Sequence, residues 1–106
     1  MKKRINVLYK PAGKPFELRE IENTLTGCQE LVGGYIETVR PFSDALMVLN
    51  EEGLIRNLPS NPFFGYDFRG DWFFCGADGD EFTDVPDGLI NAWKAGRLGG
   101  EPNART

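Results

Sequence analysis

The chain has 106 residues, of which 41% are hydrophobic and 26% are charged, and this composition is that of one globular domain. Its net charge of −4 disfavours nucleic acid as a partner, because affinity for a phosphate backbone comes mainly from Lys and Arg. The longest apolar run, residues 45–49, is far shorter than the roughly twenty residues of a membrane span.

The first half of the chain predicts two hairpins joined by a short helix. Residues 4–10 and 16–19 carry apolar side chains at alternate positions, which is the period of a strand with one buried face. Residues 25–32 then carry apolar side chains at helical spacing. Residues 35–39 and 45–49 predict the second hairpin, and the latter strand should be central because it is apolar on both faces.

The second half predicts an irregular segment, one strand and one helix. The prolines within residues 58–62 exclude a central strand there, because proline has no backbone N–H to donate. Residues 72–77 predict the last strand, and an acidic turn follows at 78–81. A second helix should follow, with its inner face at residues 89–93. Residues 99–106 have almost no apolar content and predict a flexible tail.

Together these elements predict a single α+β domain over residues 1–98. Its sheet should be mixed or antiparallel, with four to five strands, and both short helices should cover the same face. The 7 prolines and 13 glycines lie between short apolar runs, as turns between strands require, and they disfavour a helical bundle.

The sequence lacks the usual equipment of an enzyme. It has no His, which is the common general base near neutral pH, and Cys28 and Cys75 form no CxxC pair. The acidic residues between positions 78 and 87 lack the ligand spacing of an EF-hand, so we interpret them as a solvated turn and a helix cap. We therefore expect a protein that is not an enzyme, has no metal or cofactor, and occupies a reducing, cytoplasmic environment.

Aromatic residues are concentrated in one segment, residues 63–74, which holds seven of them. One interpretation is that these rings fill the core while the preceding loop folds over a sheet edge. The other is that some of them form a binding surface, with polar side chains around the rings. The predicted binding residues are Arg56, Asn57, Asn61, Phe64, Tyr66, Arg69 and Trp72.

Several short motifs suggest a family. They are EIENTL at 20–25, QELVGGYIE at 29–37, NEEG at 50–53, LPSN at 58–61, WFFCG at 72–76 and DGDEF at 78–82. With these motifs the chain resembles, over about residues 5–90, the phage and mobile-element family catalogued as domain of unknown function 3846. The resemblance implies a bacteriophage or an integrated element inside a bacterial cell. It supplies no catalytic or ligand-binding residues.

Three functions follow as hypotheses. The first is a non-enzymatic accessory protein of a phage or mobile element that binds a host factor, with counter-defence as one such role. The second is a small-molecule-binding protein that sequesters a nucleotide-like ligand, with Tyr66 or Trp72 stacking on the base and Arg56 or Arg69 on the phosphate. The third is an enzyme that works through two carboxylates facing each other across a cleft.

Overall fold

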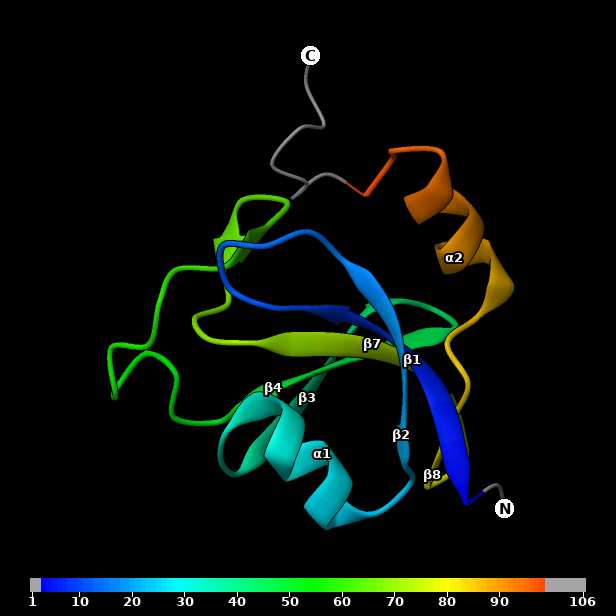
Figure 1. The fold of residues 1–106 in the computed structure, drawn as a ribbon, viewed down its shortest axis with the longest axis horizontal. Helices are drawn as coiled ribbons and strands as arrows, with labels where there is room; N and C mark the ends of the chain where they lie inside the picture. Colours follow the sequence, from blue (N-terminus) through cyan, green and yellow to red (C-terminus); the bar gives the residue numbers. More distant parts are fainter. Residues whose placement is uncertain (1–2, 99–106) are drawn as a thin grey trace.

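The fold is built on one antiparallel sheet (Figure 1). The computed structural model describes residues 3–98, so the predicted tail at 99–106 lies outside the described residues. The six-stranded sheet has the order β2-β1-β7-β4-β3, with β8 paired to β7, and each of its described strand pairs is antiparallel. The predicted α+β class is confirmed, with slightly more strands than expected.

The first predicted hairpin is formed by β1 (Arg4–Lys10) and β2 (Glu17–Glu22). Along β1, Ile5 and Val7 point to one face of the sheet and Leu8 points to the other. In β2 every side chain except that of Ile21 is exposed, because β2 is an edge of the sheet.

The predicted helix is α1 (Leu25–Val32), and its ends follow from local chemistry. The Thr24 hydroxyl accepts a hydrogen bond from the Gly27 N–H at 2.9 Å, which caps the first turn. Gly33 ends the helix in the left-handed conformation, with φ of 81°. A side chain at Gly27 would collide with the carbonyl oxygen of Glu22, so glycine lets the helix pass close to the end of β2.

The second hairpin is formed by β3 (Ile36–Phe42) and β4 (Ala45–Asn50). The first strand is longer than the predicted 35–39, because β3 continues to Phe42 across a register shift between Val39 and Phe42. Proline is tolerated there because Pro41 lies within the register shift of a strand at the edge of the sheet.

The remaining predicted strand is β7 (Trp72–Asp78), and the remaining helix is α2 (Asp87–Lys94). Three short strands lie outside the predictions: β5 (Pro62–Phe63) and β6 (Tyr66–Asp67), which pair as a separate hairpin, and β8 (Glu81–Thr83). The acidic turn after β7 therefore closes a hairpin with β8 rather than leading directly into the helix.

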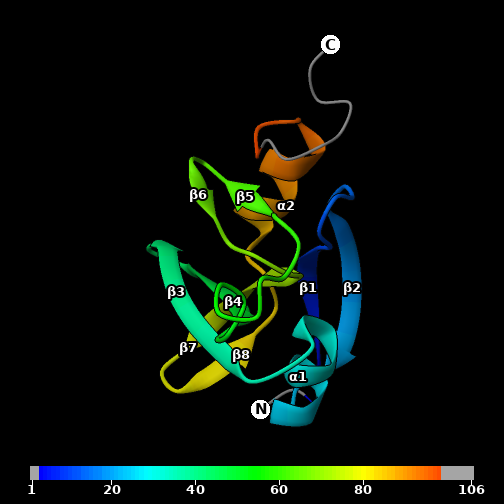
Figure 2. The same cartoon turned by 90° about the vertical axis from the view of Figure 1, so that its left-hand side faces the viewer.

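The two helices cover opposite faces of the sheet, so the prediction that they share one face is wrong (Figures 1 and 2). The α1 side is mostly aliphatic and includes Cys28, Val32 and Val48. The other side is rich in aromatic rings and includes Phe74 and, from α2, Leu89. Both faces need a cover because β7 is central, and its successive side chains alternate between them.

Candidate functional site

The aromatic segment at 63–74 is divided between the interior and the surface. The side chains of Phe63, Trp72, Phe73 and Phe74 are buried, and Trp72 is 0% exposed. Phe64 and Tyr66, by contrast, are 63% and 71% exposed, respectively. The interpretation of the rings as core therefore holds for the strand, while the preceding hairpin presents two rings to solvent.

The exposed rings border an apolar groove whose lining comes mainly from the β5–β6 hairpin and the end of β3. Figure 2 shows this hairpin next to the end of β3. Its volume is about 420 Å³, which lies within the range of small-ligand and side-chain pockets. The lining residues are Val39, Arg40, Pro41, Phe42, Met47, Phe63, Phe64, Tyr66 and Phe68.

The deeper rings of the groove are fixed by the core. Phe63 packs edge-on against Phe74 with ring centroids 5.3 Å apart, and Phe42 lies 6.0 Å from the same ring. Phe42 and Phe63 also contact each other, at 6.4 Å. Aromatic pairs at these separations are favourable beyond the area they bury. The base of the groove is therefore held in place by the sheet beneath it.

Phe64 has an unusual backbone conformation. It lies at the tip of the β5–β6 hairpin with φ of 46°, followed by Gly65 with φ of 88°. Positive φ at both central residues defines the turn that favours Asn-Gly, because a bulky side chain is disfavoured in the left-handed region. The Phe64 ring lies 4.3 Å from the Phe63 ring, yet most of its own surface is exposed. The chain therefore holds an aromatic ring at the groove rim in a strained position.

Asn61 and Trp72 hold the hairpin in place, so the prediction that they contact a partner is wrong. Asn61 is 0% exposed, and its side-chain amide donates to the carbonyls of Lys10 and Gly70 at 2.9 and 2.8 Å. Its side-chain oxygen accepts from the Lys10 ammonium at 3.0 Å. The Trp72 indole N–H donates to the Asn61 carbonyl at 3.0 Å. Burial leaves neither side chain free for an external ligand.

The polar residues of the predicted site do not converge on the exposed rings. Arg56 lines a different hollow, beside α1, together with Tyr35 and Glu52. The Arg69 guanidinium donates to the Asn57 side chain at 2.6 Å and lies 3.6 Å from a carboxylate oxygen of Asp67.

The Asp67 carboxylate supports the same hairpin. Chiefly because the backbone N–H of Asn61 donates to it at 2.8 Å, the pKa of Asp67 lies below its usual value. The Arg69 guanidinium is therefore engaged by the side chains of Asp67 and Asn57. Of the predicted binding residues, Phe64 and Tyr66 line the groove.

Sequence reasoning missed the contribution of the second hairpin to the groove. Val39, Arg40, Phe42 and Met47 come from β3 and β4, which precede the aromatic segment by about twenty residues. The available signal was Phe42, an aromatic residue between the two predicted strands of this hairpin. The β3–β4 hairpin lies beside the aromatic segment because β4 pairs with β7.

The remaining hollows are more polar. One lies beside β2 and α1 and is lined by Glu20, Glu22 and Glu30 together with Arg4, which pairs with Glu20 at 3.4 Å. No cluster of potential metal ligands occurs within residues 3–98. Over the same range, neither helix has the length or apolar content to cross a membrane.

Comparison with protein-family models identifies a family for this chain. The model of the family described as "Domain of unknown function (DUF3846)" matches residues 4–97. Searches of curated proteins and of solved structures found no match. The family resemblance noted from the short motifs is therefore confirmed over nearly the whole described chain.

Proposed function

The chain belongs to the family of domain of unknown function 3846, and on this premise we propose that it is a non-enzymatic accessory protein that binds a segment of a host protein in its aromatic groove. The host is a bacterium, and the protein acts in the cytoplasm on behalf of a phage or mobile element. This setting comes from the motif resemblance. Interference with host defence is the role that fits a small binding protein of this origin.

The observation that carries the proposal is the position of Phe64. A left-handed conformation costs a bulky residue roughly 1–2 kcal/mol, and exposure of the ring recovers little of this through burial. Asn or Gly would form the same turn without strain. Strained residues that leave an apolar side chain in solvent are characteristic of binding sites, because contact with a partner supplies the missing burial.

The groove specifies the chemistry of its occupant. Phe42, Phe63 and Phe64 offer ring faces and edges to a large apolar or aromatic side chain. Arg40 adds one positive charge at the groove, and its guanidinium donates to the Ser43 carbonyl at 3.2 Å. No ion pair to Arg40 occurs among the described side chains. We therefore expect a protein segment that combines an apolar anchor with a nearby Asp or Glu.

The geometry favours this function over the other two hypotheses. A nucleotide bound through Trp72 and Arg56 would need a buried ring and an arginine from a different hollow. Arg69 is occupied by Asp67 and Asn57. In the hollow with the most carboxylates, one of them, Glu20, is already paired with Arg4.

Selection from a random dodecapeptide display library tests the proposal. The wild-type protein is the bait, and Phe64→Asn is the counter-selection bait, because Asn suits the turn and removes the ring. Tyr35→Asn is the matched control, since Tyr35 is also exposed but lies outside the groove. Enriched peptides should contain a large apolar residue close to Asp or Glu. Their affinity should fall at least about tenfold for Phe64→Asn and stay unchanged for Tyr35→Asn.

One further variant and one further assay extend the test. Arg40→Glu should weaken the same peptides and select against acidic ones, because it reverses the charge at the groove. A nucleotide panel in a thermal-shift assay addresses the small-molecule alternative, since a bound ligand raises the melting temperature. If no peptide is enriched, or if Phe64→Asn retains full affinity for those that are, the proposal fails.

A further inference from the structure

The outer side of β3 is a free sheet edge. The order β2-β1-β7-β4-β3 leaves β3 at one end, and within residues 3–98 no strand pairs with its outer side (Figure 2). Ile36 lies opposite Asn50 in the register with β4, and the pairing continues to Val39 opposite Met47. This edge therefore presents backbone donors and acceptors that another strand could use.

The hydrogen-bond pattern identifies which backbone groups face outward. The Glu51 N–H donates to the Tyr35 carbonyl at 2.8 Å, which makes this a hydrogen-bonded pair next to the start of β3. In an antiparallel ladder such pairs alternate with pairs that do not bond each other. Glu37 and Val39 therefore bond to β4, whereas the N–H and C=O groups of Ile36 and Thr38 point away from the sheet.

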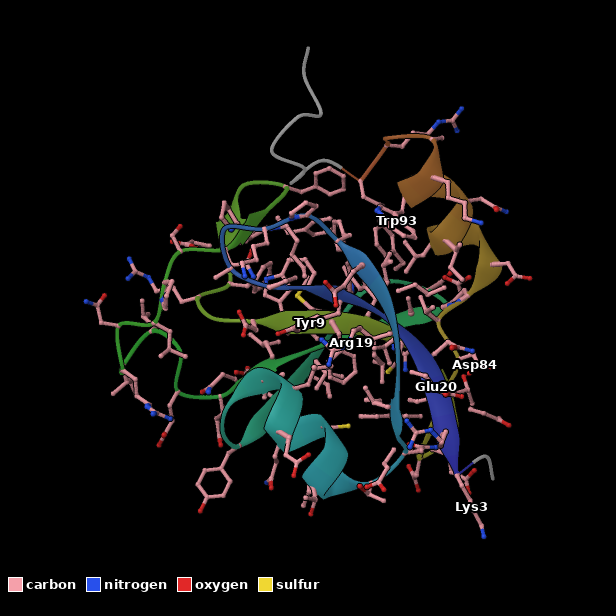
Figure 3. The ribbon with its side chains drawn as sticks, in the orientation of Figure 1. Lys3, Tyr9, Arg19, Glu20, Asp84 and Trp93 are labelled. Carbon is pink, nitrogen blue, oxygen red and sulfur yellow. The ribbon has the colours of Figure 1, made fainter. Side chains whose placement is uncertain are left out.

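The opposite edge of the sheet is protected by charge. Along β2, Arg19 pairs with Glu17 at 3.2 Å and also lies over the Tyr9 ring at 5.1 Å (Figure 3). Glu20 pairs with Arg4 from β1 at 3.4 Å. Charged side chains along an edge discourage pairing with another strand. Residues 36–39 contain one charged residue, Glu37, so this part of β3 lacks such a row of charges, whereas Arg40, Pro41 and the register shift protect the rest of the strand.

The free edge of β3 leads directly into the aromatic groove. The register shift after Val39 and the presence of Pro41 end regular pairing, so an added strand could follow residues 36–39 only. Val39 and Arg40 belong both to this strand and to the groove lining. A chain that pairs with the edge would therefore reach the groove with its next side chains.

We propose that the host segment binds as an added β-strand along residues 36–39 and inserts its apolar anchor into the aromatic groove. This inference rests on the proposed function, because it specifies how the same partner is bound. Backbone bonds to Ile36 and Thr38 supply sequence-independent affinity, and the groove and Arg40 select the apolar and acidic side chains. The occupant is an extended segment rather than a helix, since a helix has no free backbone groups to offer this edge.

Amide hydrogen exchange by NMR tests the proposal on the wild-type protein, with the most enriched dodecapeptide from the selection as the probe. The amides of Ile36 and Thr38 should exchange rapidly in the free protein and slow at least about tenfold at saturating peptide. Those of Glu37 and Val39 serve as internal controls, because they already bond to β4. Thr38→Pro should weaken the peptide about tenfold by removing one donor, whereas Thr38→Val, which keeps the N–H, should bind normally.

The experiment distinguishes failure of strand addition from failure of groove binding. If the peptide shifts the ring signals of Phe64 and Tyr66 but leaves exchange at Ile36 and Thr38 unchanged, strand addition is wrong and groove binding stands. If neither set of signals responds, both proposals fail. If the two amides are already slow in the free protein and become faster on dilution, a second copy of this chain occupies the edge, and strand addition by a host segment is overturned.

Discussion

The two ends of the aromatic segment at 63–74 are both rich in aromatic rings, but one end is buried and the other is exposed. At its C-terminal end, Trp72 and Phe74 are sealed in the core, where their rings lie 5.3 Å apart. At its N-terminal end, Phe64 and Tyr66 are mostly exposed. The difference lies in the partners of the backbone: β7 lies between β1 and β4, whereas β5 and β6 pair only with each other. Strand neighbours, rather than aromatic character, decide which rings are buried.

The largest loss of stability is expected when a buried ring of β7 is truncated. Trp72→Ala should lower the free energy of unfolding by about 3–5 kcal/mol, because it opens a cavity in the aromatic core. It also removes the donor to the Asn61 carbonyl that anchors the hairpin. Denaturant unfolding measures the loss. Tyr66→Ala, at the exposed end, should cost under about 1 kcal/mol, and equal losses at the two positions would contradict the comparison.

The buried strand β7 can also be probed at Cys75, three residues after Trp72. Burial raises the pKa of its thiol to about 12, with a smaller contribution from the nearby Cys28. Burial and the neighbouring Asp71 likewise raise the pKa of Tyr9 to about 12. In the unfolded chain these groups ionise at their lower, ordinary pKa values, so their contribution is complete below about pH 9 and is lost as pH rises toward 12.

We therefore expect the free energy of unfolding to fall above pH 9 by up to about 1.4 kcal/mol per pH unit for the Cys75 thiol, and by less for Tyr9. Denaturant titrations at several pH values give this slope, and Cys75→Ala should reduce it. At pH 8 the native thiols should react with a thiol reagent on the order of 100-fold more slowly than in the unfolded chain. Rapid native labelling of Cys75 would show that the strand is not sealed.

The smallest expected effect has the opposite sign. Phe64→Asn should raise the free energy of unfolding by up to about 1 kcal/mol, because Asn adopts the left-handed conformation more readily than Phe. A thermal melt would show this as a rise of a few degrees. A clear loss of stability would mean that the contact with Phe63 outweighs the strain, and that the ring has a structural role instead of the proposed binding role.

Much of the fold was predictable because local patterns matched their tertiary environment. The alternation along residues 4–10, the helix at 25–32 and the apolar run at 45–49 all became the expected elements. The short strands β5, β6 and β8 were not predictable, because two or three residues carry no detectable period. The side on which each helix packs was also beyond local reasoning, since it depends on the strand order.

The candidate site was only partly predictable. The aromatic density located Phe64 and Tyr66, but it gave no means of separating them from Trp72. Asn61 resembled a polar handle in the sequence, whereas in the fold its hydrogen bonds to Lys10 and Gly70 make it a structural residue.

The amino-acid sequence by itself determined the α+β class, the family and the surplus of rings before the last long strand, because composition, period and motifs are local properties. Only the tertiary structure decided which rings face solvent and which residues join them. The insertion of β7 between β1 and β4 buried Trp72, and it brought Phe42 and Arg40 beside Phe64. These contacts join residues far apart in the chain, and pairing between distant strands leaves no periodic signal in either segment.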